Sequence, residues 1–373
     1  MDPVVRTFIS LTLLLGAVVA QAKGSDSVKT ASQDPQQAQA GKHAAALKPS
    51  FAHLHTPPKG MPVMPMPKDY KPTEAMFALG QRLFHDGILS KDQKVTCASC
   101  HLAANGFAHP DKLPPGVDGK RALRHAPSLF NRGYGTLQRW DGSSASIEAF
   151  VLEPIEDPNE MGLKLSDAIA RLRADESYQK AFADAFASEP DPQTLRRSLA
   201  TFVRGIVTGN APYDRFLLGE VGEMTPQQRH GQWIFESKGA CWKCHTPPLF
   251  TDEAFHNTGI GVRDGKPEPG RKDATKDDAD NGKWKTPTLR SIRLTAPYMH
   301  DGSLATLEDV VAFYVRGGNA NSHLDRRVQK LDLSKDDQEA LIAFLRAQRI
   351  ASTPATGRRH SAESSTSDTR AAP

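Results

Sequence analysis

The chain reads CASCH at residues 97–101 and CWKCH at residues 241–245, and both stretches have the pattern C-x-x-C-H. This pattern is the attachment motif of a c-type haem. The two thiols, three positions apart, can add across the two vinyl groups of one haem, and the adjacent His then reaches the iron from the same side. The sequence therefore predicts two covalent haems, held by Cys97, Cys100 and His101 and by Cys241, Cys244 and His245.

Other uses of paired cysteines explain the pattern less well. A thioredoxin-like C-x-x-C does not account for a His at the same place in both motifs, and no βαβ pattern surrounds either motif. A zinc ribbon has its second pair about 15–20 residues after the first, whereas these pairs lie 144 positions apart. Disulfides, the usual expectation for an exported chain, would leave both histidines unexplained. The two motifs contain all four cysteines.

The spacing of apolar residues is mainly helical. Apolar positions recur every three or four residues in stretches such as 74–84, 193–207 and 334–346, and alternating strand patterns are scarce. A haem c domain needs roughly a hundred residues to enclose its cofactor, so two distant motifs predict one haem per domain. We expect a mainly α protein with two cytochrome c-like domains, residues 70–215 and 216–350, long loops and little strand.

The beginning of the chain has the features of a secretory signal. Residues 7–20 are apolar and uncharged, and small residues follow at Ala20 and Ala22. This predicts a signal peptide over residues 1–22 and a periplasmic protein without a membrane span after cleavage. An uncleaved anchor is the alternative, although the stretch is shorter than the about 20 apolar residues that span a bilayer.

The remaining end segments and the overall charge carry less information. Residues 23–69, rich in Ala, Gln, Lys and Pro, are expected to form a disordered leader or a wrapping arm. Residues 351–373 are expected to form a disordered tail. The loop 261–285, crowded with Asp, Lys, Gly and Pro, is interpreted as a solvated connection. A net charge of +4 gives no case for a nucleic-acid partner.

Between residues 74 and 348 the chain resembles the bacterial di-haem cytochrome c peroxidases and their relatives of the MauG type. The resemblance rests on many sequence blocks that occur in the family's order. In that family the first haem handles peroxide and the second passes electrons to it. The matching blocks are residues 78–101, 126–131 (APSLFN), 140–142 (WDG), 153–155 (EPI), 160–161 (EM), 285–290 (KTPTLR) and 294–302 (LTAPYMHDG).

The resemblance implies roles for four residues around the first haem. His101 is the proximal iron ligand, and Glu160 matches the distal carboxylate that moves a proton between the two oxygens of peroxide. Pro154 matches a residue that shapes the same pocket, and Trp140 matches the indole that relays electrons between the two haems. Without the resemblance, Glu160 reads as a surface charge and Trp140 as a core residue.

Two positions differ from the peroxidases and affect the iron ligands. The His that closes the resting first haem lies sixteen positions after the motif His, where this chain has Val117, and neither His109 nor His125 fits that spacing. We therefore expect a first haem that is high-spin at rest and needs no reductive activation. The second haem's distal Met is replaced by Tyr314, as in MauG-type relatives. A phenolate is a hard donor that favours ferric and higher-valent iron, although without the resemblance Tyr314 reads as an apolar-face helix residue.

Two further departures concern the distal pocket and a calcium ion. The family's pocket Gln is Phe150 here, which removes a hydrogen-bonding group. The family's calcium site uses an Asn side chain and the carbonyls of a Thr-x-Pro segment. Thr295 and Pro297 match that segment, but the Asn position is His125. Because imidazole is a poor calcium ligand, calcium stays an open expectation, with Thr295 and Pro297 as its ligands.

These inferences combine into a periplasmic enzyme that reduces hydrogen peroxide at the first haem with electrons drawn through Trp140 and the second haem. The expected partner is a small cytochrome c or cupredoxin that donates electrons, or a protein whose aromatic side chains are oxidised. The alternative is an electron-transfer cytochrome without peroxide turnover. Phe150 favours that alternative, and the missing His at position 117 counts against it.

Overall fold

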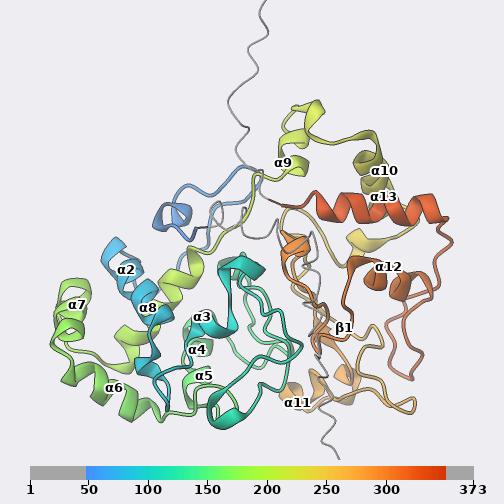
Figure 1. Ribbon diagram of the computed structural model, residues 1–373. Coiled ribbons are helices and arrows are strands. Elements are labelled where there is room, and N and C mark those ends of the chain that lie inside the picture. Colours follow the sequence, from blue (N-terminus) through green and yellow to red (C-terminus); the bar gives the residue numbers. More distant parts are fainter. Residues whose placement is uncertain (1–47, 350–373) are drawn as a thin grey trace, which may run out of the picture.

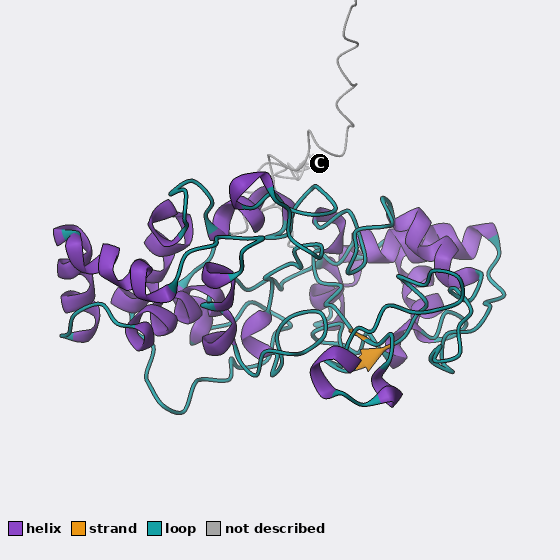
Figure 2. Ribbon diagram, turned by 90° about the horizontal axis from the view of Figure 1, so that it is seen from below, coloured by secondary structure: helices purple, strands orange, loops and turns teal. Residues whose placement is uncertain are grey.

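The computed structural model describes residues 48–349 (Figure 1). Helices gather at the two ends of the molecule, with loops between them (Figure 2), and the strands of the described residues form one two-stranded antiparallel sheet. The predicted mainly α fold with long loops and little strand is confirmed. The elements are α2 (Glu74–His85), α3 (Cys97–Cys100), α4 (Ile147–Phe150), α5 (Glu153–Glu156), α6 (Leu165–Ala174), α7 (Glu176–Phe186), α8 (Pro192–Arg204), α9 (Pro212–Leu217), α10 (Pro226–Glu236), β1 (Phe255–His256), α11 (Lys272–Thr275), β2 (Trp284–Lys285), α12 (Leu307–Val315) and α13 (Lys335–Arg346).

Each half of the molecule is built on a pair of helices that pack closely at a glycine. In the first half α2 packs on α8, and a Cβ added to Gly80 would lie 2.0 Å from the carbonyl oxygen of Ser198. In the second half α10 packs on α13, and a Cβ added to Gly231 would lie 1.9 Å from the carbonyl oxygen of Ala340. Since any side chain would push the helices apart, these glycines set how closely the helix before each haem motif (α2 or α10) packs on its partner (α8 or α13).

Separate hydrophobic cores show where the halves divide. In the second core the rings of Phe235 and Phe344 lie 5.3 Å apart, and Phe250 packs against both. Tyr213 of α9 also belongs to this core, with its ring 5.1 Å from that of Phe250. The boundary expected between residues 215 and 216 therefore cuts through a helix that packs with the second half. We propose that the boundary lies in the segment just before α9.

The two halves repeat the same backbone course over residues 126–154 and 286–314, offset by 160 positions. Each copy begins with a proline turn and a short 3-10 helix, residues 132–134 and 292–294, and it ends in a helix with a hydroxyl N-cap. Unusual left-handed residues recur at the same places in both copies. They are Asn131 and Ser291 (φ 61° and 55°) and Arg139 and Met299 (φ 65° and 76°). The N-caps Ser146 and Thr306, both with an extended backbone, are also equivalent.

The repeated segments meet through a reciprocal pair of backbone hydrogen bonds. The N–H of His125 donates to the carbonyl of His300 at 2.9 Å, and the N–H of Lys285 donates to the carbonyl of Trp140 at 2.7 Å. Lys285 is the counterpart of His125, and His300 is the counterpart of Trp140, under the same offset of 160. The contact is therefore pseudo-twofold, like the self-complementary interface of a symmetric dimer.

Residues 48–69 differ from expectation, because they follow a defined course over the protein. Leu54 and Met64 are buried, and the N–H of Ser50 donates to the carbonyl of Gly205 at 3.1 Å. The hydroxyl of Tyr134 donates to the carbonyl of Pro62 at 3.0 Å. The prediction of disorder is wrong for this part of the leader, because its two apolar anchors bury enough surface to hold it; the wrapping arm was the better interpretation.

Several predictions for the ends of the chain lie outside the described residues. They are the signal peptide over 1–22, the first part of the leader over 23–47, and the tail over 351–373. Within residues 48–349, no helix has both the length and the apolar character needed to cross a bilayer.

We expect the buried ion pair between Asp214 and Arg290 to stabilise the second half strongly. Their side chains are 2% and 0% exposed, and the Arg290 Nη2 lies 2.8 Å from a carboxylate oxygen of Asp214. Replacing Arg290 by Met leaves Asp214 buried without its counter-ion, which should cost about 3–5 kcal/mol of the free energy of unfolding. Urea denaturation followed by circular dichroism measures this loss.

The matched control for that experiment is Arg346→Met. Arg346 pairs with Glu308 at the surface, with side chains 38% and 52% exposed. An exposed pair contributes about 0–1 kcal/mol. Equal losses in the two variants would contradict the role assigned to the buried pair.

Candidate haem sites between the two halves

One cavity of about 470 Å³ lies between the halves and is lined by both haem motifs. Its size is within the roughly 300–1,000 Å³ of ligand and cofactor sites. All four cysteines are free thiols. Burial raises the pKa of Cys97 to about 12 and that of Cys241 to about 12, so both are protonated at neutral pH. Such thiols are unlike the activated thiolates of a redox C-x-x-C pair.

The two motif histidines are oriented as iron ligands. The Nδ1 of His101 lies 2.9 Å from the carbonyl oxygen of Phe107, and the Nδ1 of His245 lies 3.0 Å from that of Phe250. Both phenylalanines have a left-handed backbone, with φ of 57° and 54°. A proton on Nδ1 donates to the carbonyl and leaves the Nε2 lone pair available to a metal. The protein thus supplies the second contact that fixes a ligating imidazole.

Burial also keeps these imidazoles neutral, as a metal ligand requires. It lowers the pKa of His101 to about 4, and it lowers the pKa of His245 as well. In the first motif Thr96 and Ser99 form a capping box that closes the turn α3. This turn puts Cys97 and Cys100 three residues apart on one helical face, as two vinyl groups of one porphyrin need. The residues present therefore fit two c-type haems.

A group near the second motif has the composition of a metal site. Cys244, Asp252 and His256 bring ligand atoms close together. Both ring nitrogens of His256 are already engaged, with Asp252 at 2.9 Å and with Asp325 at 2.8 Å. Cys244 belongs to the haem motif. We interpret the group as an ion-pair network beside the second haem site.

The predicted distal residues of the first haem lie on one wall of the cavity. Glu160 and Pro154 both line it, and the carbonyl of Pro154 accepts the N–H of Met161 at 3.2 Å. Burial, together with the nearby negative charge of Asp157, raises the pKa of Glu160 to about 7, although Arg139 opposes this shift. A carboxyl group with this pKa can take up or release a proton at neutral pH.

Val117 is held close to that wall. It is 1% exposed, and its N–H donates to the carbonyl of Glu160 at 2.9 Å. The neighbouring Gly116 packs on the same turn, where an added Cβ would lie 1.9 Å from the carbonyl oxygen of Asn159. Phe150 also lines the cavity, with the Arg139 guanidinium 5.5 Å from its ring centroid.

Trp140 lies where the two halves meet. Its Nε1–H donates to the carbonyl of His125 at 2.8 Å, and its ring centroid is 6.4 Å from that of His300. His300 in turn stacks on Trp284, with ring centroids 3.8 Å apart and an angle of 15° between the planes. Trp140 therefore belongs to a set of aromatic rings that crosses the contact between the halves.

Tyr314 lines the cavity from α12, on the side of the second motif. Its phenol lies close enough to Cys241 and Cys244 to interact with them electrostatically, and burial raises its pKa well above the ordinary value. Under the offset of 160, Tyr314 is the counterpart of Pro154. At this position the second half thus has a phenol, which can bind a metal, whereas the first half has a proline, which cannot.

The residues expected at a calcium site also lie by the cavity. Thr295, Pro297 and His125 line it. The Nδ1 of His125 is 3.2 Å from the carbonyl oxygen of Asp111, and its buried Nε2 has no hydrogen-bond partner in the described part of the chain. The imidazole therefore replaces the family's amide oxygen with a nitrogen, which does not favour calcium.

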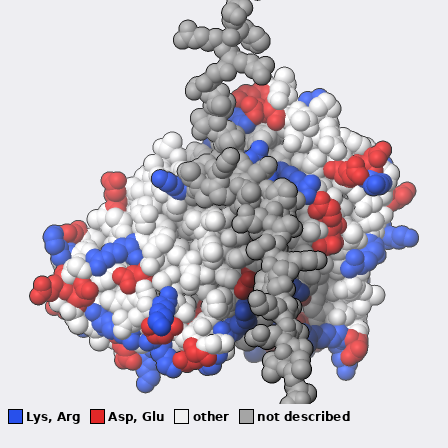
Figure 3. All heavy atoms as spheres, in the orientation of Figure 1, with Lys and Arg blue, Asp and Glu red and all other residues white. Residues whose placement is uncertain are grey.

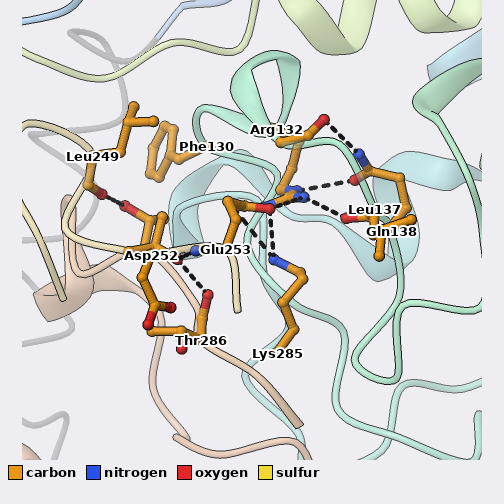
Figure 4. Close-up of polar contacts among 12 residues, drawn as sticks. Phe130, Arg132, Leu137, Gln138, Leu249, Asp252, Glu253, Lys285 and Thr286 are labelled. Carbon is orange, nitrogen blue, oxygen red and sulfur yellow. Dashed lines mark hydrogen bonds and ion pairs between the residues drawn. The ribbon is translucent and has the colours of Figure 1, made fainter. Parts of the chain in front are cut away.

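A buried ionic group next to the cavity was missed by sequence reasoning. Arg132 of the first half pairs with Glu253 of the second, and Glu253 also approaches Lys285 (Figure 4). In the sequence, Lys285 is marked only by its place in the block KTPTLR, which belongs to the resemblance. The one sequence signal that could have found it is the internal repeat, which aligns Lys285 with His125.

Similarity to known proteins identifies the family of this chain. A family model described as di-haem cytochrome c peroxidase matches residues 74–222. The methylamine utilization protein MauG of Methylorubrum extorquens is 34% identical over 308 residues, which cover 81% of this chain and 84% of that protein. The chain belongs to the di-haem cytochrome c peroxidase family.

Other relatives of this peroxidase-family chain extend the match. Cytochrome-c peroxidase IdrP1 of Pseudomonas sp. strain SCT is 31% identical, and the alignment covers 79% of this chain and 86% of that protein. The crystal structure of a MauG-like protein associated with microbial copper homeostasis superposes with a TM-score of 0.73 at 33% identity, covering 78% of this chain and 94% of that one. Family membership confirms two haem c groups and a di-haem oxidoreductase of the peroxidase type.

We expect each motif to hold one haem independently. Replacing both Cys241 and Cys244 by Ala removes the two thioether links of the second site. The variant should therefore carry one covalent haem per chain, counted by the pyridine haemochrome assay and by the mass of the denatured chain. Trp242→Ala, which changes an exposed residue inside the same motif, should keep two. Two haems in the double variant would contradict the assignment.

Proposed function

We propose that this family member reduces hydrogen peroxide in the first pocket and draws the electrons through Trp140 from the second. The observation that carries the proposal is Glu160, a cavity carboxyl whose pKa is raised to about 7 next to the first motif. When bound, the haem supplies the electrons that cleave the O–O bond. Glu160 accepts a proton from one peroxide oxygen and returns it to the other, which lets that oxygen leave as water.

The first pocket is proposed to be open to peroxide in the resting protein. Val117 stands where the classical peroxidases have a closing His, and it is tied to the Glu160 turn by a backbone hydrogen bond of 2.9 Å. His109 does not take over this role, because its Nδ1 accepts the N–H of Asp111 at 3.0 Å in the loop. This supports a first haem without reductive activation.

Tyr314 is proposed as the distal ligand of the second haem. Its place on the cavity wall beside Cys241 and Cys244 supports this role. Its phenol is protonated at neutral pH unless a cation replaces the proton, and a ferric iron provides such a cation. The resulting hard anionic donor would stabilise oxidised iron and make the second haem a partner in oxidation rather than an electron store.

The reducing substrate, which gives up the electrons for peroxide reduction, is proposed to be a protein. MauG-type relatives with a Tyr at this place support oxidation of a partner's aromatic side chains, whereas the peroxidase relatives support a small cytochrome c or cupredoxin as donor. Acidic and basic side chains are interspersed on the face in Figure 3, so charge alone does not single out a docking area there. The electron-transfer alternative has one observation in its favour, the apolar Phe150 on the cavity wall.

Two further parts of the proposal concern location and calcium. We propose export to the periplasm by the signal sequence over residues 1–22, in keeping with haem c attachment. A calcium ion, if held, would use Thr295 and Pro297, both of which line the cavity. The nitrogen of His125 in place of an amide oxygen is the observation against tight binding.

Glu160→Gln tests the proton-transfer step. The variant keeps the size of the side chain but cannot exchange a proton, so kcat/KM for peroxide should fall about 10²–10⁴-fold. In the unaltered protein kcat/KM should rise with pH through about 7, because the reactive form is the carboxylate and its pKa is about 7. The pH–rate profile of the variant should lose this step.

The control for this experiment is Glu156→Gln, which alters an exposed carboxylate four positions earlier and keeps its ability to accept the N–H of Leu165. Its profile should match that of the unaltered protein. A Glu160 variant that retains both the rate and the pH step would contradict the assigned role.

Tyr314→Phe tests the ligand of the second haem. The change removes only the phenol oxygen, so the ferric absorption and electron paramagnetic resonance spectra of one haem should change while the other stays the same. Tyr298→Phe is the matched control, because Tyr298 lines the same cavity but donates its hydroxyl to the carbonyl of Ile292 at 3.2 Å. An unaltered spectrum in the Tyr314 variant would remove it as a ligand.

A further inference from the structure

The ionic group in Figure 4 has an uneven arrangement of contacts. Glu253 is bound on both oxygens by Arg132, at 2.7 Å and 3.2 Å. Lys285 is farther from the same carboxylate, with its Nζ 3.5 Å and 3.4 Å from the two oxygens. Hydrogen bonds between an ammonium and a carboxylate usually measure about 2.7–2.9 Å. Glu253 is therefore mainly the partner of Arg132.

Charge is also uneven in this group. Arg132 and Lys285 bring two cations, whereas Glu253 brings one carboxylate, and the side chain of Lys285 is only 8% exposed. Asp252, which also interacts electrostatically with Lys285, is already paired with His256 at 2.9 Å. Burial, followed by the positive charge of Arg132, lowers the pKa of Lys285 to about 7. A buried ammonium in this position calls for another anion.

The arrangement of these side chains indicates from which side such an anion would approach. Arg132, Gln138 and Lys285 all line the cavity, whereas Glu253 does not. Arg132 cannot turn away, because its Nε donates to Gln138 at 3.0 Å and its Nη2 donates to the carbonyl of Leu137 at 2.9 Å. The cavity wall therefore presents positive charge at this place.

The group lies at the joint of the two halves and close to the second motif. The N–H of Lys285 donates to the carbonyl of Trp140, and Pro287, two positions later, lies beside His245. A haem carries two propionate carboxylates, and a haem attached at either motif would bring them to this cavity, which both motifs line. Because the haem is covalently attached, its carboxylates would be held at fixed positions in the protein.

We propose that Lys285, with Arg132 beside it, binds a haem carboxylate from the cavity side. This inference rests on the two haem sites but not on peroxide turnover. A carboxylate between the two nitrogens balances the charge of the group and completes the contacts of Lys285. Because Arg132 comes from the first half and Lys285 and Glu253 from the second, the bound carboxylate also becomes part of the contact that joins the halves.

Lys285→Met tests the proposal in the purified di-haem protein. Removal of a positive charge beside a haem favours the more positive ferric state, so the midpoint potential of that haem should become lower. The propionate bending band in its resonance Raman spectrum should shift, because the carboxylate loses a hydrogen bond. The haem whose potential and band change identifies the source of the carboxylate.

The matched control is Lys283→Met. Lys283 precedes Lys285 by two positions, pairs with Asp280 at 3.0 Å and does not line the cavity. It should leave both potentials and both Raman bands unchanged. A purely structural role for Lys285 would lower the thermal stability without moving the propionate band, and this outcome, like identical results for the two variants, would overturn the proposal.

Lys285→Arg is a second test, for use if the Lys285→Met variant does not fold and bind both haems. It keeps the positive charge but changes the donor geometry. The potentials should stay near those of the unaltered protein while the propionate band moves. An unmoved band in this variant would refute the proposal. Because none of these measurements uses peroxide, their failure is distinct from the failure of the peroxidase mechanism.

Discussion

The reciprocal pair of backbone hydrogen bonds between the halves is the constraint on which the rest of the site depends. His125 donates to His300, and Lys285 donates to Trp140, at 2.9 Å and 2.7 Å. Each of the four residues also places a side chain on the cavity wall. The same two bonds therefore fix the distance between the pockets, the position of the indole between them and the position of the buried ammonium. A shift of one half along the other would break all of these contacts together.

The pseudo-twofold contact explains how one scaffold can serve two different haems. The backbone repeats with an offset of 160 residues, whereas the side chains at equivalent positions differ. Trp140 is equivalent to His300, and Pro154 is equivalent to Tyr314. Backbone hydrogen bonds and left-handed residues carry the geometry, so the side chains can change without moving the pockets. The cavity wall consequently has the carboxyl group of Glu160 near the first motif and the phenol of Tyr314 near the second.

The local signals in the sequence predicted the motifs, the helices and the mainly α fold, because each depends on residues close together in the chain. Glu160, Trp140, Pro154 and Tyr314 needed the resemblance, and the structure gathers them on one cavity. Lys285 was missed in a loop interpreted as solvated. Its burial depends on Arg132 and Glu253, which lie far away in sequence. The arm over residues 48–69 was misjudged for a similar reason, since Leu54 and Met64 are buried only by distant residues.

The electrostatic environment differs between the two ends of the cavity. Near the first motif, burial and Asp157 hold the pKa of Glu160 at about 7, so a proton is available there at little cost in free energy. Near the second motif, burial keeps the phenol of Tyr314 protonated until a cation compensates its charge. The carboxyl group of Glu160 and the phenol of Tyr314 thus lie near different haem motifs on the wall of one cavity, which Trp140 also lines. If the proposed roles of Trp140 and Glu160 hold, electrons pass through the indole while the exchangeable proton stays on the carboxyl group, so the two kinds of charge follow different paths.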